Sequence, residues 1–467
     1  MVLNILRVKN KSLVQTCRLF LISVCALGSF AQAQNNPQVG VFETVSLIGQ
    51  INAQRTYLEN GLRIFVVEDH TSPTLAYYTY FDVGSRAEVK GKTGLAHMFE
   101  HMMFRGTKKY PGTGFRDKTT QIGAFEVNAE TQTQLTKYQQ EVPASQLETI
   151  IDLESDRMAN LVVDQKTFET EREAVKEELR ADMESSPEGP VWEKLYGDAF
   201  QTNSRNWLTI GHKEDLDAET GDDAKDFFKR NYAPDNATVI VVGDVKPADV
   251  YQKINQYYGK IPAAKQPHFQ VTPEPEQTQQ RRDAVHGNFE NEMFLAGYQI
   301  PAVSNAYSPA LNVLSMILAG NENSRLNQAL VETGIATAVS AGPSAAQEKD
   351  LFLVEVYANH GHTAAEAEAV LNKVLAKLQT DLVTDAELEA TKSHIQLGIR
   401  ENFLKHTDIA DFLGTAQIIN RSPENAITFQ DAMLTVTKED IQNVARKYLL
   451  QSNETMIYGL PKAEGTK

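Results

Sequence analysis

Cysteine is nearly absent from this 467-residue chain, which contains only Cys17 and Cys25. Both lie within the first 33 residues, which we predict to be a leader that is removed. The remaining chain would then have no disulfide, no thiolate metal ligand and no cysteine nucleophile. A cysteine-free chain is also chemically stable in an oxidising compartment.

Residues 1–33 have the composition of a secretory signal peptide. A basic start precedes an apolar run from Leu19 to Phe30, and Ala31-Gln32-Ala33 supplies a small-x-small cleavage site. The run is shorter than the roughly 20 apolar residues that a transmembrane helix needs. We therefore predict an exported, periplasmic protein, and an uncleaved N-terminal anchor is the alternative.

Long apolar runs and an excess of basic residues are missing as well. No segment after the leader is long and apolar enough to span a bilayer. The chain has 45 Lys and Arg against 61 Asp and Glu, a net charge of −16 that becomes −20 without the four basic residues of the leader. This charge disfavours nucleic acid and anionic membrane surfaces as partners, and its simplest role is solubility.

The chain after the leader divides into two parts of similar length. A polar stretch with four prolines over 262–282 is typical of a linker. It separates residues 45–261, which we expect to form the N-terminal metal-binding catalytic half, from residues 283–463, which we expect to form a C-terminal half of similar fold without a metal site.

The two halves end with the same pattern of residues. In each, a Thr-x-x-Asp capping box precedes a tyrosine, and a glycine follows eleven residues after that tyrosine. The residues are Thr220, Asp223, Tyr232 and Gly243 in the first half, and Thr437, Asp440, Tyr448 and Gly459 in the second. This offset of about 216 residues indicates a degenerate duplication. Strand and helix signals without strict alternation predict an α+β fold, in which each half is a mostly antiparallel sheet with helices packed on it.

The strongest chemical signal is His97-Met98-Phe99-Glu100-His101, within a segment of helical spacing. On a helix, residues four apart lie about 40° apart around the axis and residues three apart about 60°. His97, Glu100 and His101 therefore share one face, where two imidazoles can bind one zinc ion and the carboxylate can reach a water molecule. His-x-x-Glu-His is the inverzincin pattern. The alternative is a histidine pair on a polar helix face without a metal.

A third zinc ligand is expected from the acidic helix predicted at 166–182. Glu171 and Glu178 are seven residues apart, almost two helical turns, so both project in the same direction. Glu178 could bind the metal while Glu171 supports a ligand from behind. Glu177 points about 100° away from Glu178 and is the weaker candidate.

The chain resembles the pitrilysin family of zinc peptidases, and in particular its bacterial branch similar to the β subunit of the mitochondrial processing peptidase. The resemblance covers essentially the whole chain after the leader and is most specific over residues 80–180. Its motifs are Val83-Gly-Ser-Arg-Ala-Glu88, Gly91 to Thr107 around the two histidines, Asn128-Ala-Glu-Thr131, Leu153 to Met158, Glu171-Arg172 with Glu178, and Tyr232 to Asn236.

The resemblance implies a single zinc ion held by His97, His101 and Glu178. It also implies that Glu100 is the general base and that Glu171 is a supporting catalytic carboxylate. Asn128-Ala129 would lie on an edge strand that pairs with the substrate backbone, which suits an endopeptidase acting on peptides or unfolded segments.

One expected feature of the family is missing from the second half. Family members usually carry an Arg there and a Tyr seven residues later, which contact the substrate or its developing oxyanion. Here these positions hold Leu330 and Thr337. We therefore expect a homologous partner subunit to supply the Arg and Tyr in a heterodimer, although a homodimer is possible. A non-catalytic or peptide-binding subunit of a peptidase-like complex is the alternative function.

Overall fold

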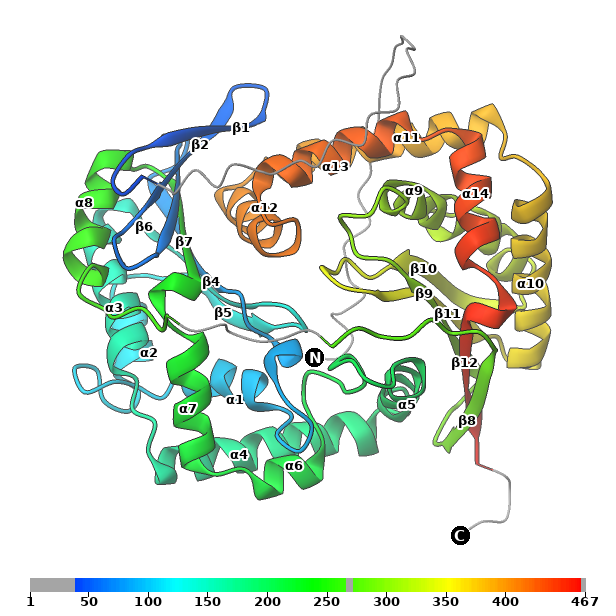
Figure 1. The fold of residues 1–467 in the computed structure, drawn as a ribbon, viewed down its shortest axis with the longest axis horizontal. Coiled ribbons are helices and arrows are strands. Elements are labelled where there is room, and N and C mark those ends of the chain that lie inside the picture. Colours follow the sequence, from blue (N-terminus) through cyan, green and yellow to red (C-terminus); the bar gives the residue numbers. More distant parts are fainter. Residues whose placement is uncertain (1–37, 266–271, 463–467) are drawn as a thin grey trace.

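The computed structural model describes residues 38–265 and 272–462. The predicted signal peptide lies outside the described residues. Two sheets dominate the structure and face each other across the molecule (Figure 1). In the described part of the chain, no helix is both long enough and apolar enough to cross a membrane.

The first sheet has seven strands in the order β1-β2-β3-β7-β4-β6-β5. Only the β3–β7 pair is parallel. The strands are β1 (Glu43–Ile48), β2 (Ile51–Tyr57), β3 (Arg63–Glu68), β4 (Thr74–Phe81), β5 (Phe125–Thr131), β6 (Thr136–Pro143) and β7 (Ala237–Gly243). Strand β1 begins before residue 45, so ordered structure starts earlier than the predicted boundary. Asn60 and Gly61 connect antiparallel β2 and β3, with Gly61 at φ +90°, as the hairpin requires.

The second sheet has five strands in the order β10-β11-β9-β12-β8. Only the β12–β8 pair is parallel. The strands are β8 (Arg281–Gly287), β9 (Met293–Ile300), β10 (Ala336–Pro343), β11 (Asp350–Ala358) and β12 (Glu454–Pro461). Strand β8 begins inside the predicted linker at 262–282. Strand β8 is an edge strand, and its side chains are mostly exposed or half-exposed. Its sequence is therefore polar and resembles that of a linker.

The α-helices are distributed around the two sheets. Those of the first half are α1 (Leu95–Met102), α2 (Gly114–Gln121), α3 (Leu147–Asn160), α4 (Gln165–Arg180), α5 (Gly189–Ala199), α6 (Lys213–Ala218), α7 (Gly221–Asn231) and α8 (Pro247–Tyr258). Those of the second half are α9 (Ser308–Ala319), α10 (Ala364–Thr380), α11 (Asp385–Glu401), α12 (His406–Ile419), α13 (Pro423–Thr435) and α14 (Lys438–Tyr448). Helix α9 begins at Ser308 with Tyr307 as its N-cap, and Pro309 stands in its first turn.

The expected duplication is visible in the order of the strands. The order β3-β7-β4-β6-β5 in the first sheet corresponds to β8-β12-β9-β11-β10 in the second, with the same parallel and antiparallel pairs. Both predicted capping boxes form, at Thr220 of α7 and Thr437 of α14. The hairpin β1–β2 is the addition that makes the first sheet larger. The α+β fold with two similar halves is therefore confirmed.

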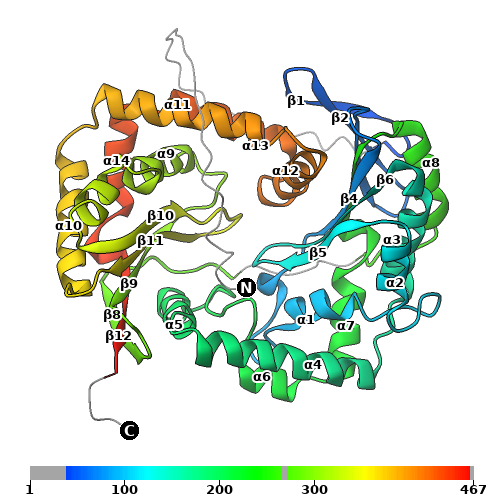
Figure 2. The same cartoon turned by 180° about the vertical axis from the view of Figure 1, so that it is seen from behind.

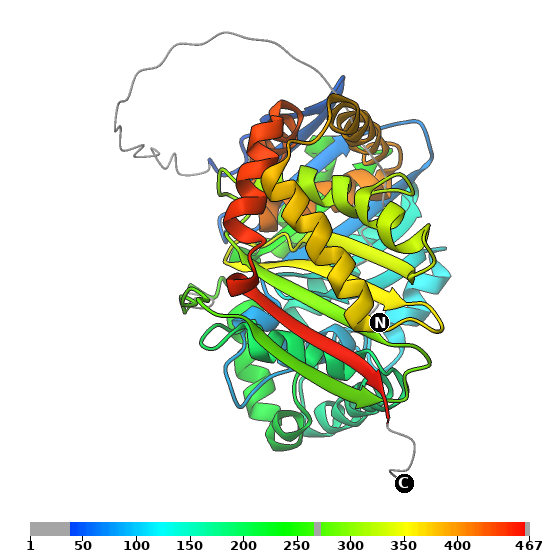
Figure 3. The same cartoon turned by 90° about the vertical axis from the view of Figure 1, so that its right-hand side faces the viewer.

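Each half covers one face of the other half's sheet. Helix α12 packs on β4 and β7, where Leu413 and Ala410 join a core with Tyr78 and Ile240. Helix α5 packs in turn on β8, β9 and β12 (Figures 1 and 2). Helices α10 and α14 cover the outer face of the second sheet (Figure 3). The halves are thus joined by apolar cores in addition to the linker.

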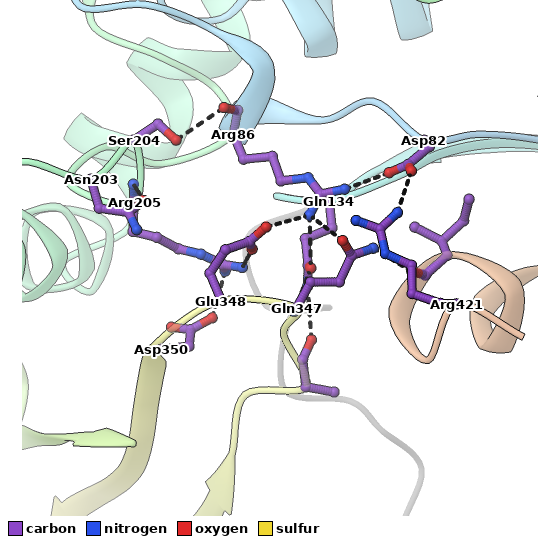
Figure 4. A network of polar contacts seen from close by, with 12 residues as sticks. Asp82, Arg86, Gln134, Asn203, Ser204, Arg205, Gln347, Glu348, Asp350 and Arg421 are labelled. Carbon is purple, nitrogen blue, oxygen red and sulfur yellow. Dashed lines mark hydrogen bonds and ion pairs between the residues drawn. The ribbon is translucent and has the colours of Figure 1, made fainter. Parts of the chain in front are cut away.

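A buried polar network also joins the halves (Figure 4). The guanidinium of Arg86 contacts Asp82 in its own half and Glu348 in the other half, and its side chain is only 2% exposed. Arg205 forms an ion pair with buried Asp350. Gln134 accepts a hydrogen bond from the backbone N–H of Gln347 and donates one to the backbone carbonyl oxygen of Ala345. These contacts fix the second sheet relative to the segment that leads into α1.

Arg157 is a buried cation beneath α1. Its guanidinium lies 2.7 Å from Glu154 and 4.3–5.5 Å from the ring centres of Tyr138, Phe115 and Phe104. The side chains of Arg157 and Glu154 are both only 2% exposed. The ion pair and the aromatic rings therefore hold this charge out of water.

Arg157→Met is expected to lower the free energy of unfolding by about 3 kcal/mol, because it leaves the Glu154 carboxylate buried without its cation. Chemical denaturation of the purified protein measures the change. Adding Glu154→Gln to this variant should recover part of the loss. Lys225→Met, which breaks an exposed ion pair with Asp222, serves as the control and should change stability by less than about 1 kcal/mol. If Arg157→Met alone is as stable as Lys225→Met, this account is wrong.

Candidate metal centre

Helix α1 carries the two histidines and is almost entirely buried. It begins after Gly94, whose φ of +101° suits glycine, and a Cβ there would come within 2.8 Å of the Ile210 carbonyl oxygen. Gly94 offers no side chain to cap the helix. The carboxylate of Glu88 takes this role by accepting a hydrogen bond from the backbone N–H of Ala96 at 2.8 Å, and it also accepts one from Trp207.

Packing of Phe99 fixes the rotation of α1. Its ring lies 5.2–6.0 Å from those of Phe227, Phe228 and Tyr232, which come from α7 and the residue after it. Because Phe99 points toward α7, the face of α1 that carries His97, Glu100 and His101 points elsewhere, toward α4, which also contacts α1.

His97, His101 and Glu178 come together between α1 and α4. One ligand atom from each residue lies within 4.8 Å of the other two, and no other such group of three occurs in residues 38–265 and 272–462. Glu178 Oε2 is 3.3 Å from His101 Nε2 and 3.8 Å from His97 Nε2. Two imidazole nitrogens and one carboxylate oxygen at this spacing fit a divalent metal ion such as zinc.

The pKa shifts of the two histidines act in opposite directions on metal binding, because only a neutral imidazole can bind a metal ion. Burial lowers the pKa of His97 to about 4, so its ring is neutral at pH 7 and keeps a lone pair for a metal. Burial acts in the same direction on His101, but the hydrogen bond and charge of Glu178 raise the pKa of His101 overall. The same hydrogen bond lowers the pKa of Glu178.

Glu100 lies on the same face of α1 and is buried. Burial raises the pKa of its carboxyl group, an effect that Thr131 of β5 and His101 partly oppose. Its Oε2 atom is buried without a hydrogen-bond partner among the described residues. A buried carboxylate oxygen without a partner costs free energy, so this atom is available for a water molecule or substrate.

Glu171 is buried behind His101. Its Oε2 lies 4.0 Å from His101 Nδ1, and its Oε1 lies 2.5 Å from Arg105 Nε. The contact with Arg105 is an ion pair without hydrogen-bond alignment, because neither Glu171 oxygen has a hydrogen-bond partner within the described residues. Glu177, the weaker candidate ligand, instead points to solvent and pairs with Arg180.

A cleft of about 200 Å³ opens beside the cluster. Glu100 and His101 line one side, and Asn128 and Ala129 of strand β5 line another. Strand β5 is an edge of the first sheet, so its outer backbone groups have no neighbouring strand among the described residues. The tertiary structure thus places the preferred candidates of the sequence at one site, and it leaves Glu177 outside that site.

Sequence reasoning missed three residues of this site. Glu88 caps α1, Trp207 donates a hydrogen bond to the Glu88 carboxylate, and Arg116 lines the cleft from α2. Glu88 lies in a recognised motif, but nothing in its spacing marks it as a helix cap. Leu330 is fully buried in the second half, and Thr337 is exposed on edge strand β10, so neither resembles a substrate-binding Arg or Tyr.

Comparisons with known proteins identify the family of this chain. Residues 63–211 match the family described as insulinase (peptidase family M16), and residues 218–395 match the one described as peptidase M16 inactive domain. The chain is 27% identical to zinc protease PqqE of Helicobacter pylori, over 86% of this chain and 92% of that protein. It is also 27% identical to the mitochondrial-processing peptidase subunit beta of Blastocladiella emersonii, over 46% of each.

A solved structure has the same fold over nearly its full length. The crystal structure of a protease from Helicobacter pylori superposes with a TM-score of 0.84 at 26% identity, covering 88% of this chain and 99% of that one. The two family matches together cover most of the described chain, and the fold agrees with them. The chain therefore belongs to the pitrilysin (M16) family of zinc-protease-like proteins.

Proposed function

We propose that this chain is a zinc-dependent endopeptidase that hydrolyses peptides or unfolded segments of proteins. The observation that carries the proposal is the convergence of His97, His101 and Glu178, with Glu100 on the same helix face beside an open cleft. The similarity to zinc protease PqqE supports the same proposed function.

Hydrolysis needs a base as well as a metal. A zinc ion held by the two histidines and Glu178 would polarise the peptide carbonyl and acidify a water molecule. Glu100 takes a proton from the attacking water through its unpartnered Oε2 and returns it to the leaving amine. Burial, which raises the pKa of Glu100, makes it a stronger base for this step.

Two further elements support the reaction. Glu171, paired with Arg105, places a negative charge on the Nδ1 side of His101, which holds the ring with Nε2 toward the metal. Edge strand β5 offers free backbone groups at Asn128 and Ala129, to which an extended substrate can add as a further strand. Recognition through the backbone favours unfolded chains over folded ones.

A homologous partner subunit is part of the proposal. Leu330 is in the core and Thr337 has no positive charge or phenol, so the second half lacks the Arg and Tyr of the family. A heterodimer partner would supply them, and a second copy of this chain is the alternative. The relative from Blastocladiella emersonii is itself named as a subunit. We further propose that residues 1–33 direct export to the periplasm.

A non-catalytic role is the second candidate function. The match over residues 218–395 is to a family described as inactive, although this stretch does not include the metal cluster. A peptide-binding subunit would use the same edge strand β5 but would not depend on Glu100. Metal content and the effect of replacing Glu100 therefore separate the two functions.

The purified chain should contain one zinc ion, and Glu178→Gln should abolish stable binding. Removing one of three protein ligands should weaken affinity beyond the ~10–100-fold cost of losing an outer partner. Metal analysis by mass spectrometry after dialysis measures the content. Glu177→Gln, one residue away on an exposed and paired side chain, is the matched control and should keep its zinc. Equal zinc loss in both variants would contradict the ligand assignment.

Glu100→Gln should retain zinc but lower peptide hydrolysis by about 10²–10⁴-fold, because the amide cannot accept the proton of water. Cleavage of an unfolded protein or a quenched fluorescent peptide measures the rate. If the variant hydrolyses substrate at the rate of the unchanged protein, the peptidase proposal is wrong and the non-catalytic role is favoured.

Without its partner, the chain should hydrolyse peptides roughly 10²–10³-fold more slowly, which is the usual effect of losing an oxyanion-stabilising donor. The comparison uses the chain alone and the chain purified together with a similar-length protein encoded beside it. Full activity of the isolated chain would contradict the proposed heterodimer, but it would not contradict the proposed zinc site.

A further inference from the structure

The cleft beside the metal cluster carries an uncompensated positive charge. Two arginines, Arg105 and Arg116, contribute to its lining. Arg105 is neutralised by Glu171, from which its Nε is 2.5 Å away. No carboxylate of residues 38–265 or 272–462 forms an ion pair with Arg116; the described contacts of this residue are hydrogen bonds that its carbonyl oxygen accepts from Thr119 and Thr120.

Two acidic residues close in sequence to the cleft, Asp117 and Glu130, have other partners. Asp117, the next residue on α2, accepts a hydrogen bond from Thr113 at 2.8 Å. Glu130 on β5 pairs with Lys137 of β6 on the side away from the free edge. A divalent ion with Glu178 and the base Glu100 is neutral overall, so the guanidinium of Arg116 is left as the net charge of the cleft.

The rest of the cleft fits one amphipathic side chain. Phe104 and Ala129 give it apolar lining, and Asn128 adds an amide donor near the free edge of β5. A peptide that adds to β5 with one carbonyl at the metal cluster would direct a side chain next to that bond into this cleft. An arginine beside an amide donor is suited to bind a carboxylate.

We propose that Arg116 is a specificity-determining residue that selects an aspartate or glutamate next to the bond that is cut. The proposal rests on the proposed function, since it assigns the substrate class of the same site. The net charge of the whole chain is −16, which would repel acidic peptides at long range. The Debye length is about 8 Å at physiological salt, so the contact with Arg116 outweighs that repulsion once the peptide is in the cleft.

The test compares cleavage of a peptide library, in which one position varies, by the unchanged protein and three variants. The chain is used together with its partner if the isolated chain is slow. Mass spectrometry maps the cut sites, and kcat/KM is then measured for peptides that carry Glu, Gln or Lys at the selected position.

The unchanged protein should prefer Glu to Gln by about tenfold or more, as a hydrogen bond between the exposed Arg116 guanidinium and a carboxylate provides. Arg116→Gln should bring this ratio close to one. Arg116→Glu should invert the preference so that Lys peptides are cut faster than Glu peptides, which a merely structural defect would not produce. The Glu preference should also weaken at high salt.

Lys118→Gln is the matched control, because it removes one positive charge from the same helix at a residue that does not line the cleft. It should keep the Glu preference, and zinc content should be the same in all variants. Cleavage by the unchanged protein without any acidic preference, or with a preference that Arg116→Glu leaves intact, overturns the specificity proposal alone. Absence of cleavage by every preparation overturns the peptidase function on which it rests.

Discussion

The contact between helices α1 and α4 is the constraint on which the rest of the structure depends. It brings two imidazoles and three carboxylates, Glu100, Glu171 and Glu178, into one largely buried place. Arg105 offsets one of these carboxylates. Like charges confined together in low dielectric repel strongly, so the cluster needs a further cation for balance. A divalent ion at His97, His101 and Glu178 would supply that balance.

The surroundings of α1 explain how so short a helix, with three ionisable side chains, is kept in a core. Its N-terminus is capped by the buried Glu88, and Gly94 allows the chain to turn directly into it. Phe99 is held among three aromatic rings, and beneath the helix Tyr138 donates a hydrogen bond to the carbonyl oxygen of Phe99. These contacts fix the direction of the helix face that carries His97, Glu100 and His101.

Duplication has produced halves with one strand order and different chemistry. By its position in the repeat, α9 is the counterpart of α1, and its buried residues are apolar apart from two serines. The second half therefore has no ligands at the equivalent place, and its role within one chain is structural. It supplies α12 to one face of the first sheet and the charged partners of Arg86 and Arg205.

The sequence alone determined the local features, because each depends on residues close together in the chain. The helical spacing of His97, Glu100 and His101, the two-turn spacing of Glu171 and Glu178, the Asn60-Gly61 hairpin and the capping boxes all follow from helix and turn geometry. The duplication could also be predicted from the sequence, because the matching capping box, tyrosine and glycine of each half recur at nearly the same offset.

Only the tertiary structure decided how these local features meet. The approach of α4 to α1 joins residues 77 positions apart, and no local pattern could distinguish a ligand from a solvated carboxylate there. The exchange of α5 and α12 between halves, the capping of α1 by Glu88 and the place of Arg116 in the cleft were likewise hidden. Such contacts depend on packing over long separations in sequence, which the spacing of residues does not encode.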